Sequence, residues 1–217
     1  MIPYGTFTFF LVAFIVLLPV IILGFLGKRS YVYNGISTVI MIVIIFSSDT
    51  YNLFGQKYLS VQLISFVIYL IWQVLLIMWY YKSRQKNNTF IKFLIVMILS
   101  ILPLALVKIL QSSWLGGHQI HFHEHKLIEF VGFLGISYVT FKSVQLIMEI
   151  RDGSIKEIKV GKLIQFISFF PTVSSGPIDR YKRFVKDDKK IPTGEQYRGM
   201  VVKAIHMIMM GLSLIHI

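Results

Sequence analysis

The residues best suited to chemistry lie in Phe169–Phe184, which reads Phe-Phe-Pro-Thr-Val-Ser-Ser-Gly-Pro-Ile-Asp-Arg-Tyr-Lys-Arg-Phe. Its two prolines exclude a continuous α-helix, because proline lacks an amide proton and clashes with the preceding turn. At membrane depth, such backbone is tolerated only where protein buries it or where it lines a wet cavity. We therefore interpret the stretch as a re-entrant turn that borders a cavity and has a basic cytoplasmic flank. A purely structural turn is the alternative. The candidate site residues are Ser174, Ser175, Gly176, Pro177, Asp179, Arg180, Lys182 and Arg183.

A second group of polar residues lies in an apolar stretch that begins at Gly135. Lys142, Gln145 and Glu149 are spaced so that they share one face of a helix. Charged groups inside a membrane span are costly, usually face the bundle interior and are functional candidates. We interpret these residues as intramembrane polar groups. A structural contact between Lys142 and Glu149, or extension of Glu149 to the membrane interface, is the alternative.

The third group is a loop with several histidines, of which His121, His123 and His125 alternate along the chain. In an extended segment these three side chains would project to one side, because the side-chain period of a strand is two. Three imidazoles could bind zinc or copper. Nothing in the sequence fixes the geometry of the loop, so we favour a solvated outer loop and predict no metal site.

The composition excludes several classes of protein. Of the 217 residues, 55% are hydrophobic and only 15% are charged, whereas a typical soluble domain has about 25% charged residues. There is no cysteine, which excludes disulfides, thiolate catalysis and thiolate metal sites. The sequence also lacks the phosphate-binding glycine loop, the dinucleotide-binding glycine fingerprint and the common hydrolase motifs.

The apolar residues cluster in long runs, and about 20 such residues in a helix cross a bilayer. The segment Leu163–Val173 is too short to cross, and Val201–Ile217 begins a span that the end of the chain truncates. We predict an all-α, polytopic transmembrane helix bundle, with residues 1–217 in one integral membrane domain. Its five full spans are Phe7–Leu26, Tyr31–Ser48, Leu59–Tyr81, Phe90–Leu110 and Leu127–Ile150.

The net charge is +12, from 22 Lys and Arg against 10 Asp and Glu. Cytoplasmic loops of membrane proteins carry an excess of Lys and Arg, and most of these residues follow the first, third and fifth spans or lie in Asp179–Lys203. This distribution places the N-terminus outside and both flanks of Leu163–Val173 in the cytoplasm, so that segment must re-enter. Topology thus explains the basic charge, and we predict contact with membrane lipid and none with nucleic acid.

Three strings resemble those of the membrane-bound O-acyltransferase family. They are the opening Met-Ile-Pro-Tyr-Gly-Thr-Phe-Thr-Phe-Phe, the string Gly135–Lys142 and the string Phe170–Phe184. The last is specific, because many rare residue types fall at fixed spacing. The sequence is most similar to the branch of the family that acts on teichoic acids, and the resemblance runs over about Met1–Gly211.

The resemblance implies D-alanylation of teichoic or lipoteichoic acid in the plasma membrane of a Gram-positive bacterium. D-Alanine would come from an acidic carrier protein in the cytoplasm, as a thioester of the carrier's own phosphopantetheine, and pass to a teichoic-acid hydroxyl outside. No cofactor would be bound by this chain. The basic cytoplasmic flank suits an acidic carrier by charge complementarity, and we expect Arg180, Lys182 and Arg183 to contact the carrier or its phosphopantetheine.

The resemblance also implies a longer protein, because the family's catalytic histidine lies in a second half and no position here matches it. We interpret His206 as a packed or pore-lining residue. We expect this chain to be the amino half, inactive alone, and hypothesise that residues 212–217 are not native. Two other functions stay open. Broken helices also build secondary transporters or flippases, and a non-enzymatic membrane scaffold could dock an acidic carrier.

Overall fold

The structure is a computed structural model that describes residues 7–28, 31–46, 61–87, 89–111, 121–122, 125–126, 135–155, 157–173 and 179–215. These residues form eight α-helices, one short 3-10 helix and two strands of two residues each. The α-helices are α1 (Phe7–Phe25), α2 (Tyr31–Phe46), α3 (Val61–Lys86), α4 (Phe90–Gln111), α6 (Ile136–Arg151), α7 (Val160–Ile167), α8 (Tyr181–Asp188) and α9 (Gly194–Ile215). The 3-10 helix is η2 (Phe170–Thr172), and the strands are β1 (His121–Phe122) and β2 (His125–Lys126).

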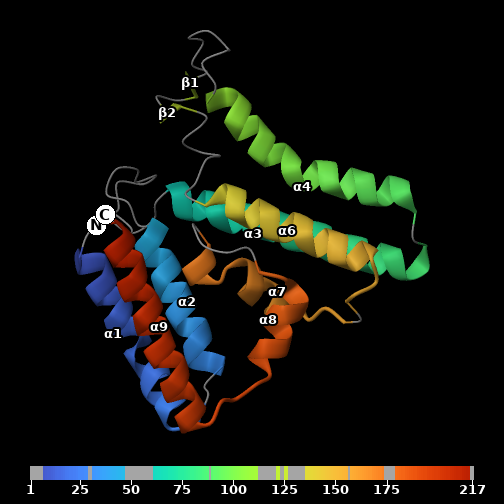
Figure 1. The fold of residues 1–217 in the computed structure, drawn as a ribbon. Helices are drawn as coiled ribbons and strands as arrows, with labels where there is room; N and C mark the ends of the chain where they lie inside the picture. The colour runs from blue at the N-terminus through green and yellow to red at the C-terminus, as the bar shows by residue number, and fades with distance from the viewer. Residues whose placement is uncertain are drawn as a thin grey trace.

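The helices form two groups (Figure 1). In one group, α1 packs against both α2 and α9. In the other, α3, α4 and α6 pack against one another. The groups meet where α2 contacts α3 directly, and the short helices add to this junction, because α7 contacts α3, α6 and α8, while η2 contacts α2. The candidate site lies in this joining region.

Three helices among the described residues are long and apolar enough to cross a membrane: Phe7–Phe25, Gln62–Lys86 and Phe90–Ile109. Many of their large apolar side chains are exposed, and on α1 Phe7 is 82% exposed. Such exposure suits helices whose solvent is lipid. The apolar helix α2 has 16 residues and is shorter than these three. The described part of the fifth predicted span is α6, which begins at Ile136.

A buried polar network ties α3, α4 and α6 together. The Tyr69 hydroxyl lies 2.7 Å from Thr140 Oγ1 on α6, and Gln73 Nε2 donates to the same hydroxyl oxygen at 2.7 Å. Gln73 and Ser100 on α4 exchange further bonds, with Ser100 Oγ donating to Gln73 Oε1 at 2.8 Å. Hydrogen bonds of this kind join helices where lipid offers no partner.

The apolar segment predicted at Leu163–Val173 is a broken helix. Helix α7 begins earlier, at Val160, and ends at Ile167, where the Ser168 amide bonds back to the Ile164 carbonyl at 2.9 Å. Phe170–Thr172 then form η2, which contains Pro171. The break agrees with the effect of proline on the residues that precede it. The predicted turn at Ser174–Pro177 lies outside the described residues.

Helix α9 begins at Gly194, earlier than the predicted span start at Val201. The cause is a capping box, in which the Thr193 amide donates to Gln196 Oε1 at 3.2 Å and the Gln196 amide donates to Thr193 Oγ1 at 3.4 Å. The reciprocal bonds satisfy amides that the first helical turn leaves free. The helix therefore includes polar residues that the hydropathy pattern alone excluded.

The histidine-containing loop does not run as one extended strand. β1 and β2 pair antiparallel, with His121 opposite Lys126 and Phe122 opposite His125. The chain therefore reverses between the two strands, and the period of a single strand does not run from His121 to His125. The arrangement of three side chains on one side of an extended segment therefore has no support in the two described strands, and His123 lies outside the described residues.

Candidate functional site

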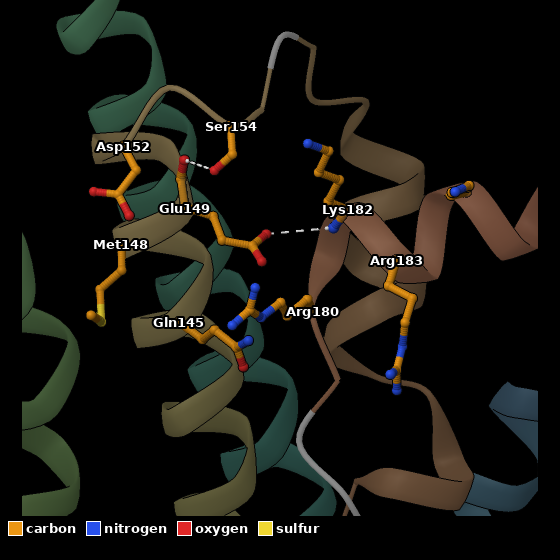
Figure 2. A pocket seen from close by; sticks show the side chains of 9 residues that line it. Gln145, Met148, Glu149, Asp152, Ser154, Arg180, Lys182 and Arg183 are labelled. Carbon is orange, nitrogen blue, oxygen red and sulfur yellow. Dashed lines mark hydrogen bonds between the residues drawn. The ribbon is translucent and has the colours of Figure 1, made fainter.

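An open cleft lies between the C-terminal half of α6 and the start of α8 (Figure 2). It has a volume of about 650 Å³. Its lining combines four cationic side chains with two carboxylates. The lining residues are Gln145, Met148, Glu149, Asp152, Ser154, Arg180, Lys182, Arg183 and Lys186.

Glu149 joins the two sides of the cleft. Its Oε2 accepts a hydrogen bond from the backbone amide of Lys182, 3.4 Å away. That amide belongs to the first turn of α8, where amides have no partner within the helix. The Arg180 guanidinium attracts the same carboxylate, and Figure 2 shows it between Gln145 and Glu149. Glu149 thus supplies the α8 N-terminus with an acceptor from another helix.

Asp179 orders the chain just before α8. Its Oδ1 accepts the Arg180 amide at 2.7 Å and lies 2.6 Å from Arg183 Nε. The Arg183 side chain is 66% exposed, so this ion pair adds little to overall stability. Its consequence is local, because it fixes the direction of one arginine beside the cleft.

Helix α8 is anchored to α7 at both of its ends, by an ion pair at one end and by ring packing at the other. Lys162 forms an ion pair with Asp188, whose side chain is 7% exposed. The ring of Tyr181 packs edge-on against Phe166, with the ring centroids 5.4 Å apart. Burial raises the pKa of the Tyr181 phenol above its ordinary value. The phenol is therefore neutral at physiological pH. Because both ends of α8 are held against α7, the helix carries its basic residues in a fixed position.

Lys142 lies on α6 but away from the cleft lining. Its side chain is buried, and Nζ donates to Thr172 Oγ1 at 2.6 Å. Glu149 faces Lys182 and Arg180 instead. The structure therefore gives these two charged residues of α6 different partners, and the alternative of a mutual contact does not match the geometry.

The structure brings together five of the residues that the sequence singled out. Gln145 and Glu149 meet Arg180, Lys182 and Arg183 in the cleft. Ser174, Ser175, Gly176 and Pro177 lie outside the described residues, and His121 and His125 lie in the strands β1 and β2.

Sequence reasoning missed Met148, Asp152, Ser154 and Lys186 as lining residues. Lys186 was open to prediction, because it lies four residues after Lys182 and shares its helix face. Asp152 and Ser154 follow the end of α6 and carried no comparable pattern. Ser154 Oγ donates to the Glu149 carbonyl at 3.0 Å, which holds this turn at the edge of the cleft (Figure 2).

The chemistry of the cleft favours an anionic ligand. Arginine and lysine side chains around a wet cavity bind phosphate and carboxylate groups by charge-assisted hydrogen bonds. Within the described ranges, no three His, Cys, Asp or Glu residues lie close enough together to hold a metal ion. The site is therefore best understood as a cationic binding cleft.

Fold and site together define an α-helical membrane protein with a cationic cleft beside a broken helix. Over 212 residues, 97% of this chain, the sequence is 48% identical to a protein named teichoic acid D-alanyltransferase from Bacillus subtilis (strain 168). A protein of the same name from Lacticaseibacillus rhamnosus is 43% identical over 213 residues, and one from Streptococcus thermophilus is 33% identical over 209 residues. The aligned part is 50%, 47% and 46% of these relatives, respectively. No protein-family model matches the chain.

The chain is thus homologous to the teichoic acid D-alanyltransferases, which are acyltransferases. The resemblance predicted from the three strings is confirmed. The chain spans about half the length of the curated relatives it matches.

Proposed function

We propose that this chain takes part in D-alanylation of teichoic acids in the plasma membrane of a Gram-positive bacterium. The names of the homologous proteins support the reaction, and their sources support the type of bacterium. The three long apolar helices support the membrane location.

In the proposed reaction, a teichoic-acid hydroxyl outside the cell attacks the D-alanyl thioester carbonyl. An ester forms, the carbon–sulfur bond breaks, and the hydroxyl proton ends on the released thiol. The thioester arrives on the phosphopantetheine of an acidic cytoplasmic carrier, so this chain needs no resident cofactor. A base that activates the hydroxyl is required, and we assign that role to none of the described residues.

The part of this reaction that we assign to the chain is recruitment of the carrier. The observation that carries the proposal is the cleft, where Arg180, Lys182 and Arg183 surround a cavity next to a helix break. A phosphopantetheine arm carries one phosphate, and an acidic carrier surface adds further negative charge. Complementary charge speeds the encounter of two such surfaces and fixes their orientation.

The proposed topology has five spans, one re-entrant segment and an external N-terminus. The break between α7 and η2 supports the re-entrant segment, because a helix of eight residues is too short to cross a bilayer. The basic residues that flank the break support its cytoplasmic location.

The proposal is tested by charge reversal. A triple variant with Arg180→Glu, Lys182→Glu and Arg183→Glu is expected to lose most of its affinity for the acidic carrier. The wild-type affinity should weaken as salt is added, since surface charges are screened within about 10 Å at 0.1 M salt. Binding is measured with purified chain in nanodiscs and carrier bearing phosphopantetheine.

The matched control is Lys189→Glu combined with Lys190→Glu, at the other end of the same helix and outside the cleft lining. The control should bind the carrier nearly as well as the wild type. An equal loss of carrier affinity in both variants would show that net charge alone causes the effect, which would contradict a specific role for the cleft. Unchanged binding in the triple variant would also contradict the proposal.

A further inference from the structure

Lys142 is a buried cation with a complete set of partners. Lys142 is only 2% exposed, although its side chain carries an ammonium group. Besides the 2.6 Å bond to Thr172 Oγ1, Nζ lies 3.4 Å from the Phe166 carbonyl oxygen and 3.5 Å from that of Ile167. An ammonium group has three protons, so these three oxygens account for its donors.

The partners all belong to the point where the helix breaks. Phe166 and Ile167 are the last residues of α7, whose final carbonyls have no amide partner within the helix. A positive charge is favourable at a helix C-terminus because the helix dipole is negative there. Thr172 is the last residue of η2. One side chain of α6 therefore holds both sides of the break.

An electrostatic interaction with Asp179 links Lys142 to the cleft. The Asp179 carboxylate attracts the Lys142 ammonium group electrostatically. The same carboxylate binds the Arg183 side chain and the Arg180 amide. Asp179 therefore interacts electrostatically with the buried Lys142 and directly with two cleft arginines.

We propose that Lys142 is a positioning residue that sets the geometry of the cationic cleft without touching its ligand. It does so by fixing the α7–η2 break against α6 and by orienting Asp179 at the start of α8. The choice of a phosphate ligand rests on the proposed function. The positioning role of Lys142 does not depend on the proposed function, so the ligand and the positioning role are tested separately.

The geometric test uses the absence of cysteine in the chain. Met148→Cys on α6 and Lys186→Cys on α8 place a pair of spin labels on opposite sides of the cleft. In nanodiscs, Lys142→Met is expected to broaden or shift the distance distribution between the labels. Thr172→Val, which removes one acceptor with little change in shape, should produce a smaller change in the same direction.

The matched control is Lys82→Met, which makes the same chemical change at an exposed position on α3. It should leave the distance distribution unchanged. If Lys142→Met does not fold, Thr172→Val and Asp179→Asn carry the test. A distribution identical to wild type in every folded variant would overturn the proposal.

The ligand test titrates chains without labels against phosphopantetheine. Lys142→Met is expected to weaken binding by roughly 2- to 30-fold, the range typical of residues that act through others. Asp179→Asn should weaken binding as well, and the double variant should lose less than the product of the two losses, because both act through one path. Lys142→Arg should recover part of the affinity.

The outcomes separate the two proposals. If wild-type chain does not bind phosphopantetheine but the label distances respond to Lys142→Met, the assigned ligand is wrong and the positioning role stands. If binding is normal in Lys142→Met and the distances are unchanged, the positioning role is wrong and the cationic cleft stands. Independent, fully multiplicative losses in the double variant would contradict the path through Asp179.

Discussion

Glu149 places a negative charge inside an otherwise cationic cleft. Its carboxylate accepts the Lys182 amide and faces the Arg180 guanidinium. A phosphate ligand would bind these same groups, because helix N-termini and arginines both bind anions. Glu149 therefore occupies part of the position that an anionic ligand would take, and its charge opposes the ligand.

Glu149→Gln is therefore expected to raise the affinity of the cleft for phosphopantetheine by roughly 2- to 10-fold, the effect of removing a nearby like charge at a partly screened site. The side-chain oxygen remains as a weaker acceptor for the Lys182 amide. Isothermal titration of the purified chain in nanodiscs gives the affinity.

The matched control for this prediction is Glu157→Gln, which removes one negative charge from an exposed side chain outside the cleft lining. It should change the affinity little. A lower affinity in Glu149→Gln would show that the carboxylate arranges the cleft for its ligand and does not compete with it.

At the scale of elements, the end of α1 and the start of α9 depend on a close approach. Phe25 and Tyr197 pack edge-on with their ring centroids 5.3 Å apart. A Cβ atom at Gly24 would overlap the Tyr197 ring, and one at Gly194 would meet the Phe25 carbonyl oxygen at 2.5 Å. Two small residues thus allow these helices to meet (Figure 1).

Gly24→Val is expected to destabilise this contact, because the added side chain must displace an aromatic ring. Overpacking of this kind typically costs about 1–3 kcal/mol. Thermal unfolding in detergent gives the loss of stability, and hydrogen exchange at Tyr197 and Arg198 shows whether it is local.

Gly35→Val on α2 is the matched control, since a Cβ atom there meets nothing within 4 Å. It should be nearly neutral. Tyr197→Ala should restore part of the stability lost in Gly24→Val. Equal destabilisation by the two glycine variants would show that a general effect on helices, and not the contact with α9, is responsible.

At the scale of the whole molecule, two groups of helices meet where α2 contacts α3 and where the short elements η2 and α7 pack against them. The proposed topology places the segments before and after α7 on the cytoplasmic side. A reporter fused after Lys86 is expected to be cytoplasmic, and one fused after Gln119 external, because the positive charges follow that pattern. Fusions to an alkaline phosphatase and to a fluorescent protein measure the two locations independently.

An external reporter after Lys86 and a cytoplasmic one after Gln119 would contradict the proposal that the N-terminus is external. These locations would also place the cationic cleft outside the cell, away from a cytoplasmic carrier. Transport driven by an ion gradient, without dependence on the carrier, would instead favour a secondary transporter.

By itself, the sequence determined the membrane class, most of the helices and the break near Pro171, because hydropathy and proline act locally. The three strings also predicted the homology, since rare residues at fixed spacing preserve ancestry. The start of α9 could have been read from Thr193 and Gln196, which form a recognisable capping pair. Hydropathy placed that start too late because the first turn of the helix is polar.

Only the tertiary structure decided which polar residues meet. Glu149 and the Lys182 amide are 33 positions apart, and Lys142 and Thr172 are 30 apart. Spacing placed Lys142 and Glu149 on one helix face but could not choose their partners. That choice depends on how α7 and α8 pack against α6, a long-range property that local periodicity does not contain.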